Sequence, residues 1–195
     1  MNYLNCMEEN SMKILTFQHK NIIRDIQSKG LYITQIDSEY KKMTPRCYDI
    51  VFDSIPDKED GSSKPIFGWQ RVSIGDYNEI KVDEKTIERC LEMVPIDLST
   101  HLLFELDIPK ERVSLQNFYN FVDARCEEEG FDRYYKTFVE FPIHVIFQLD
   151  AGENQCTFSS IRKEYIKNIY EVIKREKFIT IIKKDVREIF LRYNY

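Results

Sequence analysis

Two polar side chains that could bind a ligand stand at the end of the first predicted strand. Residues 13–17, KILTF, have the apolar and β-branched content of a short strand. Thr16 and Gln18 fall on the same side of this strand, because side chains alternate between its two faces. The pair can hydrogen-bond a ligand in a cleft. Alternatively, Gln18 and His19 cap the helix that begins next.

The single tryptophan stands two residues before an arginine in the predicted strand 65–72, PIFGWQRV. The indole of Trp69 can stack on a base or a nicotinamide ring, and the guanidinium of Arg71 can hold a phosphate. The alternative is a tryptophan in the core beside an arginine at the edge of the sheet.

Two carboxylates alternate near the end of the predicted strand that begins at His101. Glu105 and Asp107 face the same side, and paired carboxylates can perform acid–base chemistry. Pro109 follows closely, and acidic residues at strand ends commonly lie in solvent. We therefore interpret both side chains as solvent-exposed.

The cysteines and histidines give no pattern typical of a metal site. The chain has five cysteines, an odd number, which are widely spaced and include no CxxC pair. This pattern disfavours a disulfide framework and a zinc site. We therefore expect the cysteines to be small apolar side chains buried in the core. His101 and His144 have no neighbouring ligand at a metal-binding spacing. A nucleophilic cysteine would need an adjacent base, which the sequence does not indicate. The cysteines are Cys6, Cys47, Cys90, Cys126 and Cys156.

Charge is unevenly distributed along the chain. Residues 162–195 contain ten Lys or Arg against five Asp or Glu, although the whole chain has a net charge of −5. A basic segment on an acidic body can contact nucleic acid or another partner. Because acidic residues are interspersed among the cations, a solvated helix face with internal charge pairs is the alternative.

The overall composition is ordinary for a globular protein of 195 residues, with 43% hydrophobic and 31% charged residues. No apolar run approaches the about 20 residues that a membrane helix needs. The start of the chain is polar and acidic, unlike a secretory signal. We therefore expect a cytoplasmic protein without membrane contact.

Predicted strands and helices alternate irregularly. Strands are expected at 13–17, 31–34, 65–72, 101–106 and 155–161. Helices are expected at 22–30, 46–55 and 84–94 and after Ser114. A further helix is expected in the tail, because Tyr165, Ile169, Tyr170 and Ile173 have helical spacing. The polar loop 56–64 is the best candidate for a mobile segment. No GxGxxG or GxxxxGK[ST] turn is present, which disfavours Rossmann and Walker nucleotide binding.

These elements predict an α+β fold with a mixed, split sheet, surrounding helices and a C-terminal helical extension. We expect a single domain over residues 12–173 and a basic extension over residues 174–195.

Five segments occur in this order: KILTFQHKNIIRDIQSKGLYIT, a tyrosine-containing helix at 47–52, PIFGWQRV, FELDIPKERVSLQNFYNFV and NQCTFSSIRKEYIKNIYEV. Over about residues 12–173 they resemble the bacterial and phage family called domain of unknown function 3841. In that family, tryptophan is common where Leu15 and Phe67 stand here, and aspartate where Asn117 stands. The family is uncharacterised, so the resemblance implies no particular chemistry.

A short first strand, a helix ending in glycine and a late strand opening with glutamine are also similar to ADP-ribosyltransferase folds. That resemblance implies a split sheet whose cleft holds NAD. It also implies a polar residue on the first strand, an aromatic residue on a second, and a glutamate on a late strand that supports the transition state. The matching positions here are Thr16, Phe67 or Trp69, and residues 155–157, which contain no carboxylate. Binding of an NAD-type ligand is thus implied, whereas catalysis is not.

Two functions fit these features. In the first, the protein binds a nucleotide-like ligand, such as NAD, in a cleft lined by Thr16, Gln18, Trp69, Arg71 and Gln155. In the second, it is a non-catalytic interaction module, encoded by a phage or mobile element, that occupies a host protein; the aromatic fraction of 13% favours such contacts. Nucleic-acid binding through the basic segment 162–192 is a third alternative.

Overall fold

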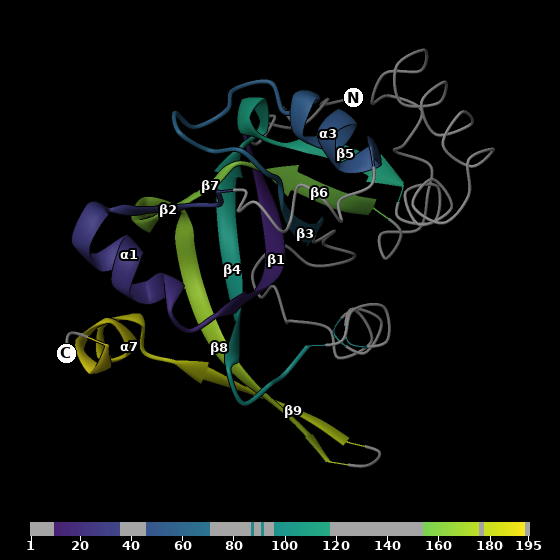
Figure 1. The fold of residues 1–195 in the computed structure, drawn as a ribbon. Helices are drawn as coiled ribbons and strands as arrows, with labels where there is room; N and C mark the ends of the chain where they lie inside the picture. The colour runs from purple at the N-terminus through teal and green to yellow at the C-terminus, as the bar shows by residue number, and fades with distance from the viewer. Residues whose placement is uncertain are drawn as a thin grey trace, which may run out of the picture.

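The computed structural model describes residues 10–35, 46–70, 87, 91, 96–117, 154–175 and 178–193 (Figure 1). Within these ranges the chain has an α+β fold with two antiparallel sheets and three short α-helices whose bounds are defined. The α+β class predicted from the sequence is confirmed.

Seven strands form one sheet through the centre of the described structure. Their order is β5 (Ser114–Asn117), β6 (Asn154–Phe158), β3 (Ile66–Gln70), β1 (Ser11–His19), β4 (His101–Pro109), β8 (Ile166–Arg175) and β9 (Phe178–Lys184). A second, two-stranded sheet pairs β2 (Leu31–Ile33) with β7 (Ser160–Arg162). All pairings among these strands are antiparallel. The expected mixed, split sheet was therefore wrong for these strands, because β1 pairs with both β3 and β4 and leaves the large sheet continuous.

The first helix, α1 (Ile22–Lys29), ends as the sequence predicts. Gly30 adopts a left-handed conformation with φ of 78°, and its amide donates a hydrogen bond to the carbonyl of Ile26. Glycine has no Cβ to oppose this conformation, so it closes the last turn at low cost. The helix buries Ile22, Ile23 and Ile26 against the large sheet.

Two further helices have different surroundings. Helix α3 (Arg46–Asp53) buries Val51. Helix α7 (Val186–Arg192) has Asp185 as its N-cap, and the side chain of Asp185 accepts hydrogen bonds from the amides of Arg187 and Glu188. This N-cap satisfies two amides that the first turn leaves without helical partners.

The two faces of the large sheet carry separate apolar clusters. The α1 face includes Ile14 and Phe104, and both α1 and α7 pack on it. The opposite face, called the Trp69 face here, includes Leu15, Leu103 and Val172. Alternation along β1 explains this division, because Ile14 and Leu15 are consecutive and point to opposite faces.

The C-terminal part of the chain is not the helical extension that the spacing predicted. Ile169, Tyr170 and Ile173, which have helical spacing, lie in β8, whereas Tyr165 ends the short 3-10 helix η4 (Lys163–Tyr165). Strand β9 pairs with β8 along its length. The prediction was wrong because β8 is buried on both faces: Ile169 contributes to the cluster on the α1 face, and Tyr170 and Val172 to that on the Trp69 face. Two buried faces give an apolar pattern that also matches a helix. Among the described residues after Ser160, α7 is the only α-helix.

The helix expected after Ser114 was also wrong at its start, because Ser114–Asn117 is strand β5 and pairs with β6. The rest of that predicted helix lies outside the described residues, as does most of the predicted helix 84–94.

Candidate functional site

One row of side chains crosses the Trp69 face from β5 to β8. Successive register pairs join Gln116 to Gln155, Gln155 to Trp69, Trp69 to Leu15, Leu15 to Glu105, and Glu105 to Asn168. Directly opposed residues of antiparallel strands project from the same face. We call these six residues the polar row, because four of them have polar side chains in addition to the indole of Trp69.

Two amides occupy one end of the polar row. The Nε2 atom of Gln116 donates a hydrogen bond of 2.8 Å to Oε1 of Gln155, and both side chains are buried. Trp69 lies beside Gln155 in the register and is 7% exposed. An indole and two amides next to each other provide a stacking surface together with hydrogen-bond donors and acceptors.

A buried carboxylate lies on the other side of Leu15. Glu105 Oε2 accepts hydrogen bonds from the phenol of Tyr170 at 2.6 Å and from Nδ2 of Asn168 at 2.7 Å. A register irregularity lies between Glu105 and Leu106 where β4 pairs with β8. These two donors are both neutral, and Leu15, a member of the cluster on this face, lies opposite Glu105 in the register.

The interpretation of Glu105 and Asp107 as exposed strand-end acids was wrong for Glu105, which is 6% exposed. Asp107 is partly exposed and forms an ion pair with Lys167, with 3.4 Å between Oδ2 and Nζ. Strand β4 continues to Pro109 and is paired there with β1, so Glu105 lies inside the sheet and not at its end.

Four of the five residues that the sequence suggested for one cleft are described, and they lie on two faces of the sheet. Trp69 and Gln155 are neighbours on the Trp69 face. Thr16 and Gln18 lie on the α1 face, where Thr16 is opposite Phe104 and Gln18 opposite Leu102, both members of the cluster on that face. Arg71 lies outside the described residues.

Thr16 and Gln18 interact with each other and with the backbone. The hydroxyl of Thr16 donates a hydrogen bond to the carbonyl of Phe67 at 2.7 Å, and Nε2 of Gln18 donates to Oγ1 of Thr16 at 2.8 Å. The two side chains thus link β1 to β3 from the face opposite Trp69.

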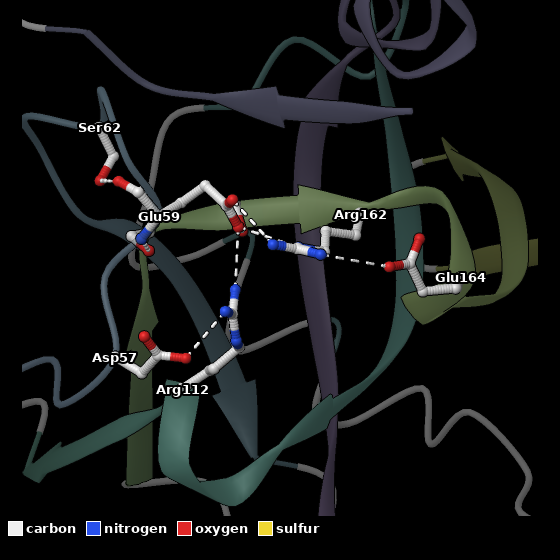
Figure 2. A network of polar contacts seen from close by, with 8 residues as sticks. Asp57, Glu59, Ser62, Arg112, Arg162 and Glu164 are labelled. Carbon is white, nitrogen blue, oxygen red and sulfur yellow. Dashed lines mark hydrogen bonds and ion pairs between the residues drawn. The ribbon is translucent and has the colours of Figure 1, made fainter. Parts of the chain in front are cut away.

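A second polar cluster, the Glu59 network, connects the loop after α3 to the rest of the fold (Figure 2). Both carboxylate oxygens of Glu59 bind Arg162, with 2.9 Å from Nε to Oε2 and 2.8 Å from Nη2 to Oε1. Arg112 Nη1 lies 2.9 Å from Oε2, and the hydroxyl of Ser160 donates to the same oxygen. The hydrogen bond from Arg162 is the main reason why the pKa of Glu59 is lowered.

Acidic residues flank the two arginines of this network. Asp57 lies 2.8 Å from Arg112, and Glu164 lies 3.7 Å from Arg162. The amide of Glu59 also donates to the hydroxyl of Ser159. Positive and negative groups therefore satisfy one another, and the loop 56–64 that we expected to be mobile is joined to η1 (Lys110–Arg112) and β7.

Sequence analysis missed several members of these clusters. Gln116 fell in a predicted helix, and Asn168 and Tyr170 in another, so their positions on a sheet face were not foreseen. The available signal was the β-branched and aromatic content of residues 166–173, which favours a strand. For Glu59 the sequence offered no signal, because its arginine partners are distant in the chain.

Neither metal nor cysteine chemistry is indicated by the described residues. Among them, no group of three or more His, Cys, Asp or Glu side chains is placed to hold a metal ion. Cys156 is fully buried on the α1 face, and burial raises the pKa of its thiol, which opposes formation of a nucleophilic thiolate. The rings of His19 and His101 pack edge to face, 5.3 Å apart.

No family model, curated protein or solved structure matches this chain. Among its described residues, no helix has the length and apolar character needed to cross a membrane.

Proposed function

We propose that this protein binds a nucleotide-like small molecule on the Trp69 face, with the base near Trp69, Gln155 and Gln116. The observation that carries the proposal is the polar row, in which an indole, two amides and a carboxylate share one face of the sheet. The proposal concerns binding alone and assigns no chemical step.

The chemistry of the row suits a nucleoside. Indoles stack on bases, and amides can pair with the donors and acceptors on a base edge. The carboxylate of Glu105 can accept hydrogen bonds from ribose hydroxyls, as acidic residues do in dinucleotide sites. Each group therefore has a counterpart in the proposed ligand.

The cost of burying these side chains also supports a role in binding. Burying polar groups in a sheet face contributes less to stability than burying apolar ones, even when hydrogen bonds form. Positions that depart from an apolar pattern in this way are commonly functional. Because Trp69, Gln116 and Gln155 are all buried, the side chains above them must move before a ligand can enter.

The resemblance to ADP-ribosyltransferase folds belongs to this proposal and makes NAD the first probe. Residues 155–157, which match the late strand of those enzymes, contain no carboxylate. On the Trp69 face the carboxylate is supplied by β4 instead, at Glu105. We therefore infer NAD-type binding without assigning transferase activity.

The first experiment uses the single tryptophan of the chain as its reporter. NAD and AMP are titrated into the protein while Trp69 fluorescence is recorded, and the heat of binding is measured in parallel. We expect a saturable change in fluorescence. The absence of both fluorescence change and heat up to about millimolar ligand, a binding energy near 4 kcal/mol, overturns the proposal.

A pair of matched variants locates the site. Replacing Gln116 and Gln155 together by Leu removes both members of their mutual hydrogen bond and keeps similar side-chain volumes. NAD affinity should fall about tenfold, whereas Gln18→Leu, on the α1 face, should leave it unchanged. An equal loss in both variants would contradict binding on the Trp69 face.

A further inference from the structure

The hairpin formed by β8 and β9 has a surface that the ligand-binding proposal does not use. In Figure 1 it extends beyond the other described elements, and β9 is the last strand in the order of the large sheet. Its outer half pairs Arg175 with Phe178, Lys174 with Ile179, and Ile173 with Thr180.

The outer half of the hairpin is cationic. Lys174 and Arg175 are exposed, and no ion pair engages them within the described part of the chain. Lys183 is also exposed, but it lies opposite Tyr170 in the inner half of the hairpin. Lys184 differs, because it pairs with Glu171. The chain as a whole has a net charge of −5, so these exposed cations are a local exception.

An exposed aromatic ring accompanies these cations. Phe178 is 76% exposed and lies opposite Arg175 in the register, so the phenyl ring and the guanidinium project from the same face of the hairpin. Ile182 alternates onto the same face and is 36% exposed. Lys174 and Lys183 project from the other face.

We propose that the outer half of the β8–β9 hairpin binds single-stranded nucleic acid. Unpaired bases stack on exposed aromatic rings whatever their sequence, and nearby cations contact the phosphates. The cations on both faces of the hairpin can reach phosphates on either side of a strand. This surface lies on different residues from the polar row and does not depend on ligand binding there.

The exposed side chains of the hairpin favour nucleic acid over a lipid surface for a physical reason. Membrane affinity rises with the apolar area that enters the bilayer, and Phe178 is the only highly exposed apolar side chain among the described residues of the hairpin. Stacking, in contrast, requires only one ring beside a cation, and Phe178 and Arg175 supply this pair.

The test measures fluorescence anisotropy of a labelled single-stranded oligonucleotide of about 16 nucleotides, over a range of salt concentrations. We expect affinity to fall as salt rises. Arg175→Gln should weaken binding and reduce the slope of log affinity against log salt by about 0.7. Phe178→Ala should weaken binding about tenfold and leave that slope unchanged.

The matched control is Lys110→Gln, which removes an exposed cation outside the hairpin and should alter neither affinity nor slope. Circular dichroism melts confirm that each variant is folded. Three outcomes overturn the proposal: affinity independent of salt, an equal loss in the Lys110 variant, or stronger binding to poly-glutamate or phosphatidylserine vesicles than to the oligonucleotide. The last would assign the hairpin to an acidic protein or a membrane.

Discussion

The carboxylates of Glu59, which is partly buried, and of Glu105, which is buried, are held in different ways. Glu59 lies between the guanidinium groups of Arg112 and Arg162, within a cluster of opposite charges (Figure 2). Glu105 accepts hydrogen bonds from a phenol and an amide on the neighbouring strand. The first arrangement joins a loop to the sheet, and the second lies within a sheet face.

This difference decides which of the two carboxylates could replace a protein hydrogen-bond donor by a donor from a ligand. Displacing an arginine from Glu59 would leave a partly buried charge unpaired, which is costly. Displacing Tyr170 or Asn168 from Glu105 exchanges one neutral donor to the carboxylate for another and leaves no cation without its partner. The Glu59 network is therefore suited to stability, and the surroundings of Glu105 to binding.

The largest effect on stability is expected for Glu59→Gln. The substitution leaves Arg112 and Arg162 close together without the negative charge between them, so the free energy of unfolding should fall by about 3 kcal/mol. Urea denaturation measures the change. The control is Glu164→Gln, which removes an exposed partner of Arg162 at 3.7 Å and should cost about 0.5 kcal/mol or less. Similar losses in both variants would contradict a special role for Glu59.

A second effect concerns acid stability. The folded-state pKa of Glu59 is lowered from 4.5, first by the hydrogen bond from Arg162, whereas the unfolded chain keeps the ordinary value. The ionised form therefore stabilises the fold fully above pH 4.5, and this contribution is lost as the pH falls through the lowered pKa. Unfolding free energies measured down this range should decrease more steeply for the wild type than for Glu59→Gln. Parallel curves would show that Glu59 does not contribute to acid sensitivity.

Local features of the fold were predictable from the sequence because they depend on neighbouring residues. Gly30 ends α1 as expected, since a left-handed residue after a helix favours glycine. Strands β1, β3 and β4 were also predicted, because their apolar runs are short and bounded by turn residues.

The candidate site was only partly predictable, because its members meet through strand order. Trp69 and Gln155 were proposed to share a cleft, and they are register partners. Thr16 was assigned to the same cleft, yet it lies on the other face, since no local signal tells which face of β1 meets which cluster. Glu105 was placed in solvent because the length of β4 depends on its pairing with β1.

The smallest effect is expected for Glu105→Gln, the same substitution as at Glu59. Asn168 and Tyr170 both donate to the same oxygen, Oε2, and the new amide oxygen in that position can still accept both hydrogen bonds. The free energy of unfolding should therefore change by about 1 kcal/mol or less in urea denaturation. Tyr170→Phe tests one of these hydrogen bonds by removing its donor. The free energy of unfolding of the double variant should fall by less than the sum of the two single losses, because both changes affect one interaction. A loss at Glu105 as large as that at Glu59 would mean that its carboxylate also pairs with a cation, and the contrast between the two clusters would no longer hold.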